Sequence, residues 1–344
     1  MRMELGPAAP VRREALPIMG NRFAARPDSE LSTIPPPLAP SISESPDHAR
    51  RTAAAVLGAY GGGWQASLDI GMTRVAGRTV ASHVRHAGPL RVQKVLWPEG
   101  PDLAHLILLH PPSGLAGGDS LALALAQGPD TRVLLTTPGA GRWYRADSPA
   151  TQTIDLRVGG RGSLEWLPQE TVLHDGVQGV QRMTVDVAPD AAAIGMDILV
   201  LGRKASGEHR VRGDFRSHLT LRRADRLLLG EISRIGRAEQ GIAALGQAHV
   251  SGLLWAVSPT PMHSDLAESV ESALDASLGA SPDTHGRGRD GALAGASVVD
   301  PHLLLVRAIG ESPERIRHAL AAAWAVLRPI LIGRAAVAPR IWMT

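Results

Sequence analysis

The stretch IDLRVGGRGSLEWLP, residues 154–168, reads as an alternating apolar run, a glycine-rich turn and a more continuously apolar run that ends at a proline. This order is typical of strand, turn and strand. It recurs as LALAQGPDTRVLLTTP at 123–138, TVDVAPDAAAIGMDILV at 184–200 and HLTLRRADRLLLGEI at 218–232. The four turns begin near Gly128, Gly159, Ala188 and Arg223. The unit therefore repeats about every 30 residues, a spacing at which stacked units bury a shared core.

Short alternating runs bounded by glycine, proline or aspartate precede the repeat, among them RTVASHV, PLRVQKVLW and LAHLILL. These also predict strands. We therefore expect a mainly β, β-rich α+β protein with stacked or helically wound strand layers. An ordinary antiparallel sandwich has similar strand spacing and is the alternative.

About two helices are expected near the C-terminus. In SDLAESVESALDASLG, Ser264 is expected to cap a helix whose apolar residues recur every fourth position until Gly279. A second helix is expected from Ser312 and Pro313, with Pro329 ending it. HVSGLLWAVS and VVDPHLLLVRAIG each predict a strand, and the glycine-rich DTHGRGRDGALAGAS before the latter predicts a loop.

Composition divides the chain and limits its chemistry. Residues 1–60 carry nine of the 26 prolines and predict a disordered proline-rich extension. Residues 61–237 predict the β-rich repeat-like core, and 238–344 a strand-helix-strand-helix portion of the same folded unit. The absence of cysteine excludes disulfides and thiolate metal sites. No apolar run is long enough to span a membrane, so a cytoplasmic protein is expected.

The charge pattern argues against a nucleic-acid partner. The formal net charge is only +3, and the chain contains two Phe and two Tyr. Its basic residues are scattered, and all except Lys94 and Lys204 are arginine. A nucleic-acid binder normally interleaves basic and aromatic residues on one surface.

The glycine-rich loop HPPSGLAGGD, residues 110–119, lacks the chemistry of a phosphate-binding loop. It has no lysine and precedes a strand pattern rather than a helix. GRKASGE, residues 202–208, fails in the same way because Glu208 stands where the lysine is needed. The signatures of serine hydrolases, zinc proteases and EF-hands are also missing from the sequence.

Carboxylates and histidines leave two other chemistries open. A carboxylate pair for hydrolysis could come from Asp119, Glu165, Glu170, Asp175 and Glu208, although such residues also cap turns and pair with arginine. The thirteen histidines are dispersed, so no firm metal site is expected. His110 and His174 are the candidates for transient metal contact because they flank glycine- and carboxylate-rich turns.

Two further stretches favour a protein-binding surface. In LEWLPQETVLHDG, residues 164–176, Leu164 and Trp166 share a strand face and are expected in the core, whereas Gln169 and Glu170 follow the strand directly. TTPGAGRWYR places Trp, Tyr and Arg together just after a turn. These residue types are enriched at interface hot spots.

Taken together, these stretches resemble the urease accessory protein family called UreD or UreH. The resemblance extends from about Trp64 to Thr344 and is carried by GPLRVQKVLWPEG, LLHPPSGLAGGD, LLTTPGAGRWYR, LEWLPQETVLHDG, GRKASGE and the C-terminal LRPILIGRAAVAPRIWMT. The chain departs from the family pattern at Ser113, where HPPGG is usual, at residues 141–143, where Thr-Lys-Phe is common before the tyrosine, and at His174, where an aromatic is usual.

The resemblance implies a non-catalytic maturation factor. Such proteins bind the urease apoprotein and recruit UreF, which docks the GTPase UreG. Nickel is transient cargo that moves through a polar internal passage, and no cofactor is bound tightly. The alternatives are a β-stacked hydrolase with a carboxylate pair and a stand-alone metal-binding protein. The residues expected at a partner interface or passage are Pro111, Gly114, Gly117, Gly118, Asp119, Tyr144, Arg145, Glu165, Gln169, Glu170, Arg203 and Glu208.

Overall fold

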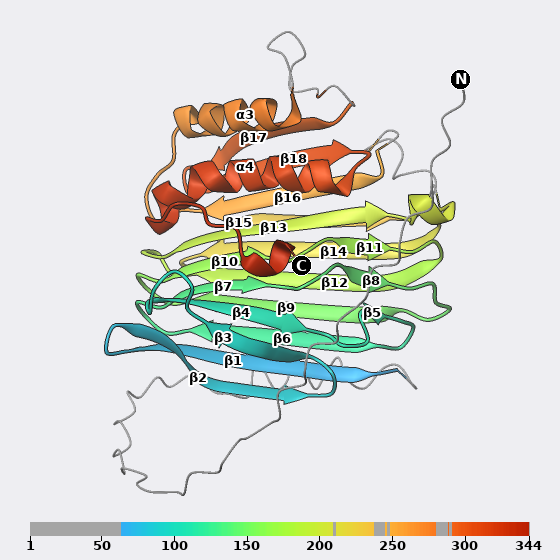
Figure 1. The fold of residues 1–344 in the computed structure, drawn as a ribbon, viewed down its shortest axis with the longest axis horizontal. Helices are drawn as coiled ribbons and strands as arrows, with labels where there is room; N and C mark the ends of the chain where they lie inside the picture. The colour runs from blue at the N-terminus through green and yellow to red at the C-terminus, as the bar shows by residue number, and fades with distance from the viewer. Residues whose placement is uncertain are drawn as a thin grey trace, which may run out of the picture. The chain divides into compact units, whose positions relative to one another are not determined.

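The computed structural model describes residues 63–208, 211–236, 245, 248–279, 288 and 291–343 (Figure 1). The predicted N-terminal extension, residues 1–60, lies outside the described residues. Two sheets and the helices packed on one of them make up the described fold. No helix of the described residues has the length and apolarity needed to cross a membrane.

The first sheet has seven strands in the order β15-β14-β12-β9-β6-β1-β2. Their bounds are β1 (Gln65–Val75), β2 (Arg78–Ala87), β6 (Ser120–Gln127), β9 (Ala150–Val158), β12 (Val177–Val187), β14 (Gly213–Arg223) and β15 (Arg226–Ile235). Strands β1, β6, β9, β12 and β14 pair in parallel, while β2 and β15 close the two edges in antiparallel fashion.

The second sheet has eleven strands, eight of them along the path β17-β18-β16-β13-β10-β7-β4-β3. These are β3 (Arg91–Leu96), β4 (Leu103–Leu109), β7 (Arg132–Thr136), β10 (Ser163–Leu167), β13 (Ala192–Leu201), β16 (Val250–Val257), β17 (Leu293–Asp300) and β18 (Leu303–Gly310). The short strands β5 (Gly114–Leu115), β8 (Gly141–Trp143) and β11 (Thr171–Leu173) join this sheet beside β13.

The chain winds between the two sheets, as the repeat predicts. It passes from β6 to β7, from β9 to β10 and from β12 to β13, each time through a connection of four residues. Successive strands of each sheet pair in parallel, so each circuit stacks on the previous one. The expected β-rich fold with helically wound strand layers is therefore confirmed, and the purely antiparallel sandwich is not observed.

The fourth stretch of the repeat, residues 218–232, does not make a circuit. Strands β14 and β15 form an antiparallel hairpin within the first sheet instead. Only Ala224 and Asp225 connect them, and both have positive φ, 49° and 62°. Two positive φ values in a two-residue turn match the twist of a hairpin, whereas a change of sheet needs a longer connection.

Apolar layers hold the elements together. The core between the sheets is built from both of them, for example Ile70, Leu156 and Val185 of the first and Leu106, Val133 and Leu164 of the second. The outer face of the second sheet packs on the helices. Every residue of β10 is therefore buried, including Leu164 and Trp166 as predicted.

Two α-helices are described near the C-terminus, α3 (Ser264–Leu278) and α4 (Pro313–Ile332). The first begins one residue earlier than expected, because His263 rather than Ser264 occupies the N-cap position. The N-cap of α4 is Ser312, whose Oγ accepts a hydrogen bond from the backbone N–H of Arg315. The apolar residues Ile316, Leu320, Ala323 and Leu327, which recur on one face of α4, are fully buried.

Three C-terminal boundaries differ from the prediction. Helix α4 continues past Pro329 to Ile332 and ends at Gly333. Pro329 removes only its own backbone N–H from the hydrogen bonds of the helix, and burial of the Ile332 side chain stabilises the last turn. VVDPHLLLVRAIG forms a hairpin rather than one strand, since Asp300 Oδ1 accepts from His302 N–H and turns the chain. The loop expected at DTHGRGRDGALAGAS, residues 283–297, ends before its last residues because strand β17 already begins at Leu293. The last element is the short 3-10 helix η3 (Arg340–Met343).

Candidate functional site

Segments far apart in the sequence meet at the end of the sheets where β5, β8 and β11 lie, which we call the short-strand end (Figure 1). Backbone hydrogen bonds connect them: Tyr144 N–H to Leu115 O, Gly141 N–H to Glu170 O and Gly202 N–H to Leu173 O, each 2.8 Å. The predicted HPPSGLAGGD, TTPGAGRWYR and GRKASGE stretches are thus neighbours in space. GRKASGE contains the short helix η1 (Lys204–Ser206).

Tyr144 packs at the centre of this end. Its ring lies edge-on to His174, with centroids 4.9 Å apart. A Cβ on Gly114 would lie 2.4 Å from the Tyr144 ring, so only glycine fits there. The hydroxyl of Ser113 lies 3.5 Å from the Tyr144 hydroxyl and accepts a hydrogen bond from Arg142 at 3.2 Å.

The Gly117–Asp119 segment is a structural turn. The Asp119 carboxylate accepts hydrogen bonds from the backbone N–H groups of Trp64 at 2.8 Å and Ala116 at 2.7 Å. Gly118 has a φ of +84°, and a Cβ on Gly117 would meet Ser148 Oγ at 2.6 Å. Both glycines and Asp119 therefore shape the backbone beneath the surface.

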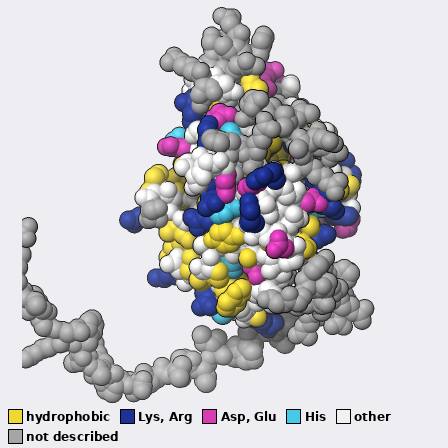
Figure 2. All heavy atoms as spheres, turned by 90° about the vertical axis from the view of Figure 1, so that its right-hand side faces the viewer, with side chains coloured by type: hydrophobic (Ala, Val, Ile, Leu, Met, Phe, Trp, Pro, Cys, Tyr) yellow, Lys and Arg dark blue, Asp and Glu magenta, His cyan; other side chains and the backbone are white. Residues whose placement is uncertain are grey.

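Ion pairs at the short-strand end turn their cations outward. Asp175 is almost buried and pairs with Arg145 and Arg212, whose side chains are 70% and 80% exposed. Hydrogen bonds from Arg212 lower the pKa of Asp175 to about 2. Arg203 likewise lowers the pKa of Glu208 to about 2. On this face of the molecule, Lys and Arg side chains lie among Asp and Glu side chains, and hydrophobic side chains gather beside them (Figure 2).

The side chains of Glu165 and Glu170, both expected at an interface or passage, point toward α4 instead. Glu165 is buried on the helix-facing side of the second sheet, where it accepts hydrogen bonds from Arg328 Nε at 2.9 Å and Trp324 Nε1 at 2.8 Å. Burial raises the pKa of Glu165, although the Arg328 guanidinium opposes the shift. Glu170 accepts from Arg317 of α4 at 2.6 Å. Both carboxylates attach α4 to the sheet and face away from the inter-sheet core.

All five carboxylates considered for hydrolysis have partners. Asp119 binds backbone N–H groups, and the other four pair with arginines. Those four are Glu165, Glu170, Asp175 and Glu208. This agrees with the interpretation that such residues cap turns and form ion pairs.

The two candidate metal-contacting histidines are single imidazoles. The Nε2 atoms of His110 and His174 are buried and have no hydrogen-bond partner. Burial lowers the pKa of both, so each is neutral near pH 7, the form that can donate to a metal. Across the described part of the chain, no three His, Asp or Glu residues are grouped to hold a metal ion.

A cavity of about 520 Å³ lies at the short-strand end and reaches between the sheets. Predicted residues His110, Pro111, Gly114 and Gln169 contribute to its lining, together with the loop 137–141. Its polar lining further in includes Gln152, Gln181 and Asp197, none of which was among the predicted site residues. The wall is otherwise largely apolar, with Leu121, Leu123, Ile154 and Trp166.

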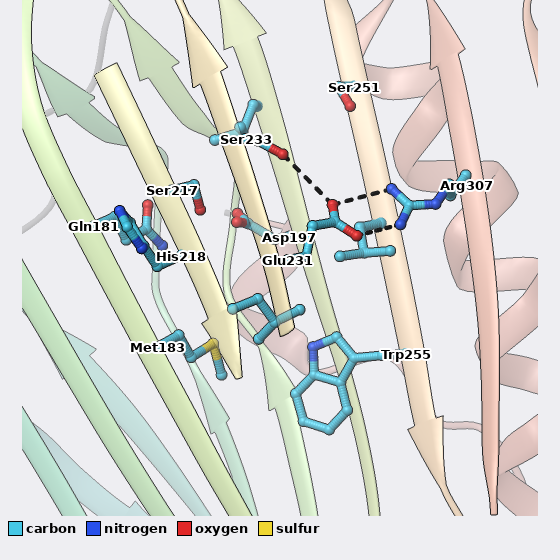
Figure 3. A pocket seen from close by; sticks show the side chains of 13 residues that line it. Gln181, Met183, Asp197, Ser217, His218, Glu231, Ser233, Ser251, Trp255 and Arg307 are labelled. Carbon is cyan, nitrogen blue, oxygen red and sulfur yellow. Dashed lines mark hydrogen bonds and ion pairs between the residues drawn. The ribbon is translucent and has the colours of Figure 1, made fainter. Parts of the chain in front are cut away.

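A second cavity of about 80 Å³ continues between the sheets toward β15 and β18 (Figure 3). Gln181 and Asp197 line both cavities, so the two adjoin at these residues. Burial raises the pKa of Asp197 to about 6. At the far side, Arg307 of β18 donates to Glu231 of β15 at 3.1 Å and joins the two sheets.

One signal in the sequence could have identified Asp197. It is the single charged residue in the apolar run AAAIGMDILVL, where a buried strand normally has none. The sequence pattern does not identify Gln152, Gln181 and Ser217 as cavity-lining residues, because polar residues also alternate on the exposed face of each strand. Only the register of the sheet separates the two faces.

Known proteins are similar to this chain over nearly all of its described part. Residues 65–343 match the sequence profile of a family described as UreD urease accessory protein. The chain is 41% identical over 287 residues to the urease accessory protein UreD of Dechloromonas aromatica and 42% identical over 302 residues to that of Delftia acidovorans. Each alignment covers 82% of this chain and 95% of the relative. The Nitrosococcus oceani UreD is 40% identical, with 82% and 90% covered.

Proposed function

The chain belongs to the UreD urease accessory protein family, and from this premise we propose that it is a non-catalytic scaffold for nickel insertion into urease. It binds the urease apoprotein and recruits a UreF-type partner, which docks a UreG-type GTPase. Nickel is the transient cargo. The observation that carries the proposal is the family match, which covers residues 65–343 and therefore nearly all of the described fold.

The short-strand end is the surface we assign to partner binding. It carries the exposed side chains of Arg145 and Arg212 together with Tyr144 and Arg142. Tyrosine and arginine are the residues that most often anchor protein interfaces. Gly114 and Gly117 allow the loops beneath this surface to pack closely against Tyr144 and Ser148.

The two adjoining cavities are the part of the fold we assign to nickel. They open at the short-strand end and pass between the sheets, where the polar side chains of Gln152, Gln181 and Asp197 face the space. A carrier must release its ion, and a cavity wall with few metal-binding side chains allows that release. The candidate hydrolytic carboxylates are all engaged, so no observation favours the hydrolase alternative.

Co-purification and gene deletion test this function. Tagged full-length chain, co-expressed with the urease subunits and the other accessory proteins, is expected to retain them. Deletion of the chain is expected to leave urease protein levels unchanged and to abolish nickel-dependent activity. Normal nickel loading of urease in the deletion strain would overturn the proposal, as would substrate turnover by the purified chain.

A further inference from the structure

Helix α4 presents an uncharged face to solvent. After His318 the helix has one charged residue, Arg328, whose side chain is completely buried. A helix on the surface of a soluble protein normally carries charged or polar residues on its outer face. Here the residues that are not buried against the second sheet are apolar, and we call the following six the apolar stripe: Ala321, Ala322, Ala325, Val326, Pro329 and Ile330.

The spacing of the apolar stripe suits a second helix. Residues four apart lie on one ridge of a helix, so Ala321, Ala325 and Pro329 form one ridge and the other three residues form the next. Packing such ridges into the grooves of another helix is the commonest contact between helices in globular proteins, with axes that cross at about 50°. The small alanine side chains allow the backbone of a partner helix to approach closely.

The exposed end of the stripe has a large apolar surface. The side chain of Ile330 is 60% exposed to solvent, although it belongs to a helix whose opposite face is completely buried. Leu266 of α3 and Val326 are half-buried and pack on the same core between the helices and the second sheet. Contiguous exposed apolar residues rimmed by polar ones are typical of a protein interaction site.

Helix α3 lies beside α4 and is acidic. Nη2 of Arg315 donates to the backbone oxygen of Leu278 at 2.9 Å, so the C-terminal end of α3 lies against the start of α4. The two helices are side by side on the second sheet (Figure 1). The sequence of α3 has no Lys or Arg, and its carboxylates are Asp265, Glu268, Glu271 and Asp275, the first three of them exposed. An apolar stripe with an acidic neighbour thus forms the outer surface of the helices, although the chain has a net charge of +3.

We propose that the apolar stripe is a second docking surface, and that it binds an amphipathic α-helix of a partner protein whose apolar side is flanked by Lys or Arg. The apolar side of that helix covers the stripe, and its basic flank lies toward α3. Interfaces commonly combine a centre depleted of charge with a rim of complementary charge. A second copy of this chain is a poorer occupant, because it brings another acidic α3 to the same contact.

The surface shares no residue with the short-strand end. The inference therefore goes beyond the proposed function, and it rests on that function only for the choice of proteins that are co-expressed in its test. The chemistry of the occupant follows from the ridges of α4 and the charge of α3.

Site-specific photocrosslinking tests the occupant. p-Benzoylphenylalanine replaces Ala325 in the tagged full-length chain, which is co-expressed with the urease subunits and the other accessory proteins and then irradiated. We expect mass spectrometry to identify a partner segment that has apolar residues at helical spacing with Lys or Arg beside them. A crosslink to a second copy of this chain, to a segment without that pattern, or to no protein would overturn the proposal.

Ala325→Glu and Ile330→Glu test the stripe itself. Each places a carboxylate on the apolar stripe and is expected to lower recovery of the crosslinked partner in co-purification by about tenfold or more. Both positions are exposed and glutamate is a good helix former, so thermal unfolding is expected to match the wild type. Ile232→Glu is the matched control, because Ile232 is 69% exposed and lies on β15 of the first sheet. Wild-type recovery in both stripe variants, or equal loss in I232E, contradicts the surface.

Salt dependence tests the charge of the partner. A synthetic peptide with the sequence of the crosslinked segment is titrated against the purified full-length chain at low and high salt. The affinity is expected to fall as salt rises, because salt screens exposed charges. The double substitution Asp265→Asn and Glu268→Gln is expected to weaken binding at low salt and to reduce this salt dependence. An affinity that changes with neither salt nor the substitutions shows that the occupant is not basic.

Failure of this surface can be distinguished from failure of the proposed function. If A325E and I330E keep every partner and load urease normally while deletion of the chain abolishes loading, the surface is wrong and the scaffold function stands. If deletion has no effect on loading, the proposed function fails, and the crosslink at residue 325 with the peptide titration still decides the surface.

Discussion

Nε of Arg328 lies 2.9 Å from Oε1 of Glu165, and both side chains are almost completely buried between α4 and the second sheet. Arg328 also donates to both carboxylate oxygens of Glu99 at 2.8 Å. One arginine near the end of the chain therefore joins α4 to β10 and to the segment before β4. This contact fixes the helical layer, while the cavities lie on the other face of the sheet.

Arg328→Met is expected to destabilise the protein by about 3–5 kcal/mol, because it leaves two buried carboxylates without a cation. Arg328→Lys is expected to recover little of that loss, since lysine cannot reproduce the forked contacts. Chemical denaturation measures both changes. Arg161→Met is the control, because Arg161 and its partner Asp130 are exposed, and its midpoint should match the wild type. An R328M midpoint equal to that of R161M would contradict this role.

The sequence was sufficient for the wound β layers, because each crossing has an alternating strand on one side and an apolar strand on the other. It was not sufficient for the roles of Glu165 and Glu170. Both belong to the stretch LEWLPQETVLHDG, which favoured a protein-binding surface. Their partners Arg328 and Arg317, however, come from helix α4, about 150 residues later in the sequence. Gln181 and Asp197 were missed for the same reason. Their shared position depends on which strands face each other across two sheets.

The β14–β15 turn offers a test of the free-energy cost of its backbone conformation. Ala224 and Asp225 both have positive φ, which Asn and Gly adopt at lower cost. The double substitution Ala224→Asn and Asp225→Gly is expected to stabilise the protein by roughly 0.5–1 kcal/mol, through the lower cost of the turn. Urea denaturation measures the gain. A loss of stability would show that the turn needs Asp225 for another contact.

Stability at acid pH should report the Asp175 and Glu208 ion pairs. Their pKa values are lowered to about 2 in the folded protein, by Arg212 and Arg203 respectively. In the unfolded chain they are near 4. The unfolded state therefore takes up protons first, so their stabilisation is fully present above about pH 4 and is lost as the pH falls toward 2.

Urea denaturation at successive pH values checks the direction of this effect. Asp175→Asn is expected to lower the free energy of unfolding at pH 7 and to flatten its decline between about pH 4 and 2, because the titrating group is gone. Glu208→Gln should act in the same way through Arg203. If D175N and the wild type lose stability in parallel over that range, the Asp175–Arg212 pair does not contribute to acid sensitivity.

The mouth of the large cavity can be changed without damage to the fold. A Cβ on Gly139 meets nothing within 4 Å, and Gly139 is absent from the positive-φ glycines, so Gly139→Trp is expected to fold normally. Gly117 and Gly118 are poorer positions for this test, since a side chain there meets Ser148 or requires a φ of +84°.

Gly139→Trp is therefore expected to impair urease activation while leaving thermal unfolding unchanged, because the indole covers the cavity mouth and the surface assigned to partners. Gly295→Trp is the matched control: Gly295 is on β17, also has open space around its Cβ, and does not line either cavity. Co-purification and urease nickel content, measured for both variants, separate the two positions. Equal activation by G139W and the wild type would mean that the cargo does not pass through this mouth and that no partner needs the surface around it. Equal loss in G295W would instead point to a general effect of an added surface tryptophan.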